Sequence, residues 1–210
     1  VTSIYKEAKA DHASFFLYSL HKIMTAVNEV EEFRYRIIDN TPVCFDRIHV
    51  GTTIGREDGT FGFGFFEYTQ QLFLQNAQKE IERVQALTGL CKDRESDRQD
   101  LVRFSPVPWI AFTEMKHASS FRTGDSATRI STGKLIEQNG HRMLPISVTA
   151  HHGLMDGRHV SILLDRIADK EDETDEQGNP FPILRMKLKM CSYELCEACF
   201  LYESDLFDKH

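Results

Sequence analysis

Hydrophobic residues recur along the first part of the chain with the period of a helix. Residues 3–26 predict a helical segment with Thr2 or Ser3 as its N-cap, and Asp11 and His12 mark a point where it breaks or bends. Its second half carries apolar residues three or four positions apart, which indicates one buried face. These residues are Phe15, Phe16, Leu20, Ile23, Met24 and Val27.

The pattern then changes to the two-residue period of strands. Phe33–Ile37 predicts a first strand, Asp39–Pro42 a turn, and Val43–Val50 a second strand. In Phe61–Phe66 glycines alternate with phenylalanines, which is typical of a strand that another segment or a ligand approaches closely on one face. Both a crossing within the sheet and the wall of a ligand site fit this alternation.

A further helix and a further strand follow. Thr69–Gln85 has helical periodicity, Thr88–Gln99 is rich in charge and predicts a surface loop, and Val102–Thr113 predicts a strand that contains a serine between prolines and apolar residues. Residues 116–128, rich in Ser, Thr and Gly, predict a loop. The residues expected to face inward from the helix are Leu72, Phe73, Ala77, Ile81 and Val84.

The next segments predict a hairpin and a last helix. Arg129–Glu137 and Arg142–Ala150 alternate as strands on either side of an Asn-Gly pair, which is a strong turn signal. Arg158–Ala168 has the periodicity of a helix. Between the hairpin and this helix stands His-His-Gly-Leu-Met-Asp-Gly, residues 151–157. A strand that ends in two histidines and a turn offers a candidate general base at a strand terminus.

Composition narrows the class of protein. A chain of 210 residues with 41% hydrophobic residues fits one well-buried domain. A net charge of −7 argues against a nucleic-acid partner, and no apolar run approaches the ~20 residues that a membrane span requires. Five cysteines, an odd and scattered set, fit reduced thiols and predict a cytoplasmic protein.

Three blocks of this sequence resemble the chloramphenicol acetyltransferase family. His151–Gly157 matches its HHxxxDG signature, and Ser105-Pro-Val-Pro-Trp109 resembles its Ser-x-x-Pro-Trp segment. Ser14–His21 and Val27–Ile37 resemble its long helix and the strand after it, so the resemblance covers about residues 5–167. It implies an α/β fold, a two-layer sandwich with a mixed β-sheet, as in coenzyme A-dependent acyltransferases.

The resemblance also implies an activity and the residues that carry it. The protein is expected to be an O-acetyltransferase that uses acetyl-CoA as co-substrate and acts on chloramphenicol or a similar small apolar hydroxylated acceptor, an activity that gives antibiotic resistance. His152 would be the general base, with His151 as its structural competitor, and Ser105 would stabilise the oxyanion. The family's threonine that helps bind the reacting centre falls at Ser131, or at Thr132 if the alignment shifts by one.

Asp156 would orient the loop, and the active site would form between the subunits of a homotrimer. In the family this aspartate pairs with an N-terminal arginine, for which Arg185 or Arg158 would have to stand in here. The expected organisation is an acetyltransferase core at 1–168, an acidic linker at 169–178 and a C-terminal segment at 179–210. Family members have further residues before the opening helix, so the C-terminal segment is either a circularly permuted N-terminal piece or an unrelated extension behind a shortened start.

Alternatives to this function are few. A catalytically impaired module of the same fold, serving in binding or assembly, is the main one. The catalytic core of a dehydrogenase-complex acyltransferase is disfavoured, since no lipoyl-bearing domain or flexible linker precedes the core. Three cysteines near the end, Cys191, Cys196 and Cys199, have no convincing fourth ligand, so no metal is expected.

Overall fold

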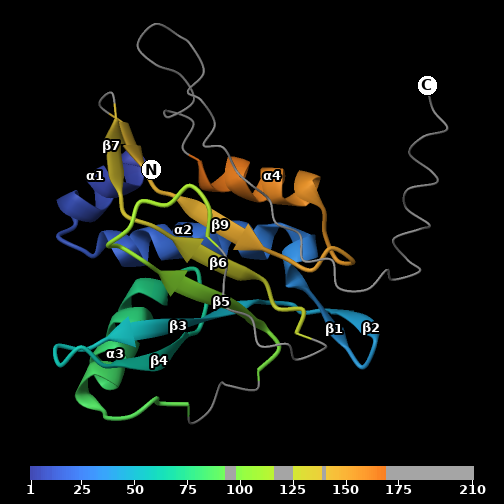
Figure 1. Ribbon diagram of the computed structural model, residues 1–210, viewed down its shortest axis with the longest axis horizontal. Helices are drawn as coiled ribbons and strands as arrows, with labels where there is room; N and C mark the ends of the chain where they lie inside the picture. Colours follow the sequence, from blue (N-terminus) through green and yellow to red (C-terminus); the bar gives the residue numbers. More distant parts are fainter. Residues whose placement is uncertain (93–97, 116–124, 139–140, 169–210) are drawn as a thin grey trace, which may run out of the picture.

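A mixed five-stranded sheet with helices packed on one face forms the centre of the molecule (Figure 1). The computed structural model describes residues 1–92, 98–115, 125–138 and 141–168. The sheet with its single layer of helices confirms the predicted two-layer α/β architecture. The C-terminal segment, its strand-like alternation and the acidic linker lie outside the described residues.

The strands of the main sheet follow the order β4-β3-β5-β6-β9. Strand β5 runs parallel to both of its neighbours, whereas β4 and β9 are antiparallel to the strands beside them. This mixture fits the sequence, because β3 and β4 are joined by a short turn while a long crossover containing a helix leads from β4 to β5. The strands span His49–Gly55 (β3), Phe61–Phe66 (β4), Leu101–Pro106 (β5), Arg129–Thr132 (β6) and Ile146–Thr149 (β9).

Helices cover one face of this sheet. The opening helical segment is two helices, α1 (Thr2–Ala10) and α2 (Phe15–Glu29), so the predicted break at Asp11 and His12 is real. The N-cap of α1 is Val1, without a side-chain hydrogen bond, and not Thr2 or Ser3. Helix α2 passes behind the sheet in Figure 1 and contacts both α3 (Phe73–Ala86) and α4 (Gly157–Ile167).

The two faces of the sheet differ in what they carry. Side chains alternate between faces along each strand, and the buried residues Val50, Val102, Phe104, Ile130 and Val148 lie on the helix side. The opposite face, called the helix-free face below, carries the residues that alternate with them. Ser105 and its strand neighbours Ser131 and Ser147 therefore lie on the side of the sheet away from the helical core.

Strand β4 shows why glycine and phenylalanine alternate. A Cβ atom at Gly62 would lie 2.7 Å from Val84 Cγ1 on α3, and one at Gly64 would collide with Ile54 Cδ1. The glycines therefore allow close packing inside the layer, which supports the sheet-crossing interpretation for that face. The phenylalanines point the other way, and Phe61 and Phe63 are exposed on the helix-free face.

Two hairpins flank the main sheet. In the first, β1 (Tyr35–Ile38) pairs with β2 (Thr41–Cys44) through Asp39 and Asn40, which both have positive φ, as a tight two-residue turn requires. A short 3₁₀-helix, η1 (Glu31–Arg34), precedes it. In the second, β7 (Ile136–Gln138) pairs with β8 (His141–Met143) and extends the β6–β9 pair, so the Asn-Gly hairpin is confirmed.

Several predicted boundaries were wrong, among them the start of the first strand, since Phe33 and Arg34 belong to η1 and β1 begins at Tyr35. The single strand expected at 43–50 is divided, because β2 ends at Cys44 and β3 starts at His49 in a different sheet. The strand expected at 102–113 ends at Pro106, after which residues 107–110 form a turn closed by the Ile110 N–H to the Val107 carbonyl at 3.3 Å. Leu72, which was expected to face inward from the helix, is exposed and precedes α3, which begins at Phe73.

One buried cation joins the first hairpin to the main sheet. Arg36 on β1 is fully buried, and its guanidinium donates to the carbonyls of Gln99, Leu101, Phe33 and Tyr35. Burial lowers its pKa to about 10, against the opposing influence of Asp125 and Asp100. The guanidinium thus replaces a missing sheet ladder between β1 and the start of β5.

Candidate active site

The histidine motif forms a tight turn between β9 and α4. The Leu154 and Met155 N–H groups both donate to the His151 carbonyl, at 3.0 and 3.3 Å, which reverses the chain directly after the strand. Met155 is buried beneath the turn. The seven residues between the strand and the helix, 150–156, are thereby fixed by backbone hydrogen bonds and one apolar anchor.

The two histidines of the motif have different surroundings. His152 is exposed, and its Nδ1 lies 3.4 Å from the Met155 carbonyl, a contact that leaves Nε2 directed outward. His151 is half-buried, and its Nδ1 accepts a hydrogen bond from the Gly153 N–H at 3.2 Å. Burial and the neighbouring His152 lower the pKa of His151. Of the two, His152 has the accessible nitrogen that a general base needs.

Asp156 is the N-cap of α4. Its Oδ1 accepts from the Arg158 N–H at 2.9 Å and the His159 N–H at 3.3 Å. Burial raises the pKa of Asp156, but those two hydrogen bonds and the His159 ring outweigh it, so the pKa lies below its ordinary value. The aspartate therefore fixes the start of the helix directly after the histidine turn.

His159 completes this cap, a role that was not predicted from the sequence. Its Nδ1 lies 3.1 Å from the Asp156 N–H and 2.9 Å from Asp156 Oδ1, and its Nε2 lies 3.4 Å from Glu32 Oε1 on η1. The spacing Asp-x-x-His is that of a capping box with histidine in place of Glu or Gln, and this was the available signal.

Neither arginine proposed for Asp156 forms an ion pair with it among the described residues. Arg158 donates its backbone N–H to the Asp156 carboxylate. Within the described residues the only ion-pair contact of Asp156 is with His159. Arg185 lies outside the described residues. In the part of the chain that is described, the side chain that contacts the Asp156 carboxylate is therefore that of His159, in the first turn of α4.

Ser105 lies in a row of hydroxyl groups on the helix-free face. Strand register pairs Ser105 of β5 with Ser131 of β6, and Ser131 in turn with Ser147 of β9. Thr132 pairs with Pro106 and, by strand alternation, projects to the helix side. Between the two aligned positions considered from the sequence, Ser131 is the one beside Ser105.

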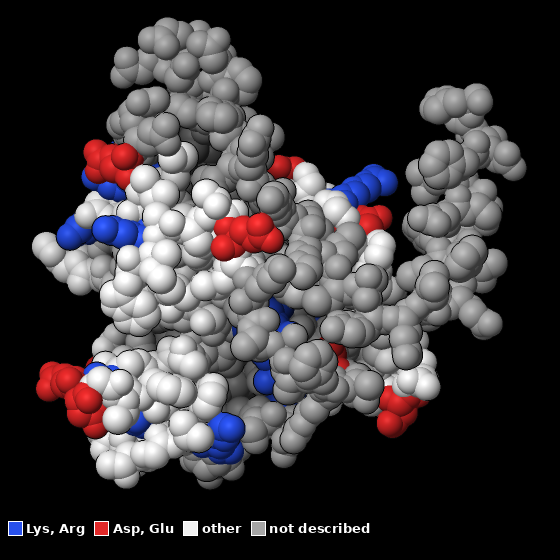
Figure 2. Space-filling view, viewed as in Figure 1, with Lys and Arg blue, Asp and Glu red and all other residues white. Residues whose placement is uncertain are grey.

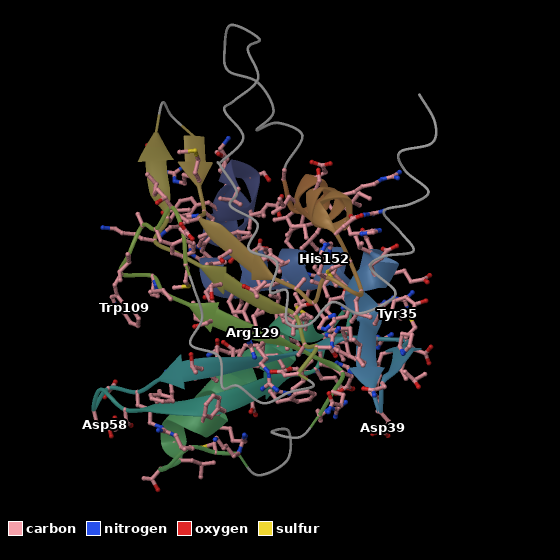
Figure 3. The ribbon with its side chains drawn as sticks, turned by 45° about the vertical axis from the view of Figure 1, so that its right-hand side comes forward. Tyr35, Asp39, Asp58, Trp109, Arg129 and His152 are labelled. Carbon is pink, nitrogen blue, oxygen red and sulfur yellow. The ribbon has the colours of Figure 1, made fainter. Side chains whose placement is uncertain are left out.

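The same register separates His152 from Ser105 within one chain. Strand β9 runs antiparallel to β6, so Thr149 lies level with Arg129 and Arg103, two residues before Ser105. His152 comes three residues later still, beyond that end of the sheet. In Figure 3 His152 and Trp109, four residues after Ser105, appear on opposite sides of the molecule with Arg129 between them.

The described residues were compared with what a metal site and a membrane-spanning helix require. Within the described ranges no group of three or more His, Cys, Asp or Glu side chains is arranged to hold a metal ion. The three C-terminal cysteines fall outside those ranges. Among the described helices, none combines the length and the apolarity that crossing a membrane requires.

Comparisons with known proteins agree with one another. A family model described as chloramphenicol acetyltransferase matches residues 1–168. A chloramphenicol acetyltransferase from Campylobacter coli is 29% identical over 77% of this chain and 79% of its own length. Chloramphenicol acetyltransferase 3 from Escherichia coli is 25% identical over 80% of each chain.

Solved structures give the same result. A structure titled chloramphenicol acetyltransferase superimposes with a TM-score of 0.72 at 29% identity, over 79% of this chain and 81% of its own. A truncated catalytic core of a 2-oxoacid dehydrogenase multienzyme complex from Thermoplasma acidophilum, 12% identical over 77% of each chain, shares the fold alone with a TM-score of 0.57. The family match over residues 1–168 decides the assignment: this chain is an acyltransferase and belongs to the chloramphenicol acetyltransferase family.

Proposed function

We propose that this protein is an acetyl-CoA-dependent O-acetyltransferase for chloramphenicol or a similar small hydroxylated acceptor. The single observation that carries the proposal is the pair of half-sites at opposite ends of one sheet. One half is the accessible imidazole of His152, and the other is the hydroxyl row at Ser105 and Ser131.

The chemistry assigns one task to each half. His152 Nε2 removes the proton of the acceptor hydroxyl, and the oxygen attacks the thioester carbonyl of acetyl-CoA. Ser105 donates a hydrogen bond to the oxyanion that develops. The carbon–sulfur bond then breaks, and the departing thiolate takes the proton back from His152. The products are the acetyl ester and coenzyme A.

A second copy of the chain brings the two halves together in this proposal. Because His152 and Ser105 of one chain lie toward opposite ends of the sheet, His152 of one subunit would meet Ser105 of the next, with the site repeated at each interface of a homotrimer. Trp109, 80% exposed, and Ile110 lie four and five residues after Ser105 and offer an apolar surface for substrate or neighbour to cover. We infer a cytoplasmic location, which the free thiols of Cys44 and Cys91 support.

Thiol release from acetyl-CoA in the presence of chloramphenicol tests this activity. We expect His152→Ala to reduce turnover by about 10²- to 10⁴-fold and Ser105→Ala by about 10²- to 10³-fold with little change in acceptor binding. His151→Ala is the matched control. Activity that survives loss of His152 but not of His151 would show that the roles of the two are exchanged.

Subunit mixing tests the interface. The His152→Ala and Ser105→Ala proteins should each have little activity alone, because every site lacks one of the two groups. A trimer assembled from both variants contains one site with both groups intact. Random reassembly of equal amounts should restore up to about a quarter of wild-type activity. A mixture that stays inactive, or a stable monomer by light scattering, would exclude a site shared between copies. An inactive wild-type protein that still binds acceptor would favour the impaired binding module.

A further inference from the structure

A row of charged side chains lies next to the hydroxyl row on the helix-free face. Strand register pairs Arg103 of β5 with Arg129 of β6, two residues before Ser105 and Ser131. Side chains two residues apart on a strand point to the same face, about 7 Å from each other. The arginines and the serines are thus adjacent rows of one surface.

A carboxylate holds the two arginines in place. Asp125 Oδ2 lies 2.7 Å from Arg129 Nη2 and 3.5 Å from Arg103 Nε, while its Oδ1 accepts from the Ala127 N–H at 3.1 Å. Two guanidinium groups therefore share one carboxylate oxygen, which leaves a net positive charge. The row is called the Arg103–Asp125–Arg129 cluster below.

The cluster keeps donors available for a ligand. A guanidinium carries five N–H donors, and within the described part of the chain the Arg103 and Arg129 side chains have Asp125 as their only hydrogen-bond or ion-pair partner. The side chain of Arg103 is 47% exposed, against 19% for Arg129 and 24% for Asp125. Arg103 is consequently the accessible member, and Arg129 the supported one.

The surroundings leave space beside Arg103. Its partner on the other side is Gly51 of β3, where an added Cβ would meet only Leu101 Cδ1, at 3.6 Å. Beyond Gly51 the next residue in register is Phe65 of β4. Figure 2, in the view of Figure 1, shows basic side chains near the middle of the molecule. An aromatic ring, a position without a side chain and a guanidinium thus follow one another across the strands, in the row next to the serines.

A purely structural ion pair would balance its charges, and this cluster does not. A surface pair of this kind also contributes little to stability, so folding alone gives no strong reason for two arginines on one carboxylate. A small acceptor that reaches Ser105 is long enough to reach a guanidinium one strand pleat away. Planar guanidinium groups bind carboxylates in a two-pronged geometry that lysine cannot offer.

We propose that Arg103 and Arg129 select an acceptor that carries a carboxylate in addition to its reacting hydroxyl. This inference rests on the acetyltransferase function proposed above and specifies its substrate class. The carboxylate binds the free N–H groups of Arg103, Arg129 supports it from the next strand, and Asp125 sets the position of both. The neutral molecule chloramphenicol then lacks the group that the cluster is built to bind.

Matched acceptors test the proposal. Chloramphenicol is compared with analogues in which a carboxylate replaces the aryl nitro group, at the para or the meta position, and with their neutral methyl esters. A nitro group and a carboxylate are nearly the same in shape, so the comparison isolates charge. We expect kcat/KM to be at least about tenfold higher for one of the two carboxylates than for its ester, in keeping with a charge-assisted hydrogen bond.

Substitutions then assign that preference to the cluster. Arg103→Met should remove the preference for the carboxylate over its ester, and Arg129→Met should weaken it. Asp125→Asn keeps the bond to Ala127 and should increase the preference, because it removes the competing charge. Arg166→Met is the control, since Arg166 is an exposed arginine of α4 in an ion pair with Glu29 of α2.

The possible outcomes distinguish a failure of the carboxylate site from a failure of the acetyltransferase function. Unchanged acceptor ratios in Arg103→Met and Asp125→Asn overturn the inference while acetylation itself stands. If no acceptor is acetylated, calorimetric titration of the carboxylate analogues decides. Binding that Arg103→Met abolishes would support the anion site and refute the proposed chemistry, whereas no binding to the wild-type protein would overturn both.

Discussion

At the scale of single residues, two sets of hydrogen-bonded polar side chains organise the surroundings of the candidate site. Arg36 lies beneath the start of β5 and donates to four backbone carbonyls, and Asp156 with His159 closes the first turn of α4. Both sets are local in geometry yet connect elements far apart in sequence. Sequence patterns identified Asp156 through its motif, but they treated Arg36 only as one charged residue in an alternating strand.

Replacement of Arg36 by methionine should destabilise the fold. The change leaves several buried carbonyls without a donor, and each such group costs about 1–3 kcal/mol, so we expect a loss of at least about 3 kcal/mol. Arg36→Lys should recover only part of it, because an ammonium has fewer donors and a different geometry. Denaturant unfolding measures both variants.

Arg166→Met serves again as a control for that experiment, since its partner Glu29 and its own side chain are about half exposed. A change of less than about 1 kcal/mol is expected there. Equal losses in Arg36→Met and Arg166→Met would mean that the buried hydrogen bonds of Arg36 are compensated elsewhere.

At the scale of elements, the sequence predicted what depends on neighbouring residues. The helical stripe of α2, the Asn-Gly hairpin and the strand–turn–helix around residues 151–157 are all encoded locally, and all are present. The division between β2 and β3 was missed because it depends on distant contacts. The Phe45 N–H donates to the Arg34 carbonyl, and the His49 N–H to the Asp100 carbonyl, so each side of the gap is held by a different partner.

The candidate site follows the same distinction. His152, Ser105 and Asp156 stand in motifs that are readable from one segment, and the choice of Ser131 over Thr132 needed only the strand register. The Arg103–Asp125–Arg129 cluster needed two strands and a loop to be brought together. Its one local signal was the four-residue spacing between Asp125 and Arg129, which by itself is too common to single out.

Glycine substitutions in β4 and β3 should have opposite outcomes. A Cβ at Gly62 would stand 2.7 Å from Val84 Cγ1 and 2.5 Å from Arg56 Nη2, so Gly62→Ala should force α3 away from the sheet and cost about 1–3 kcal/mol. Gly51→Ala meets only an ordinary contact at 3.6 Å and should be neutral or slightly stabilising. Thermal unfolding of the two variants compares them, and a stable Gly62→Ala protein would show that α3 moves freely.

At the scale of the whole molecule, several histidines are held neutral by burial. Burial lowers the pKa of His21, His49 and His151, and His49 Nδ1 accepts from the Tyr68 N–H at 3.0 Å, which requires an unprotonated ring nitrogen. Asp100, with an oxygen 3.8 Å from His49 Nε2, raises the pKa of His49 but does not cancel the effect of burial. Protonation therefore favours the unfolded chain at each of these positions.

The free energy of unfolding should accordingly fall as the pH drops below about 6.5, the ordinary pKa of histidine. In that range the unfolded chain binds protons that the folded protein does not, and the loss continues until the pH passes the lowered folded pKa values. His49→Gln should make the dependence shallower. Denaturant unfolding between pH 8 and pH 5 measures it, and a stability that rises on acidification would contradict the assignment.

The two faces of β4 differ in how far they tolerate substitution. Gly62 and Gly64 face α3, where even one methyl group has no room, while Phe61 and Phe63 are exposed on the opposite face of the same strand. A sequence can therefore vary at every second position of this strand without disturbing the layer behind it. Substitutions on one side would disturb the packing of the fold, whereas single substitutions on the other can change the exposed surface and leave the architecture as it is.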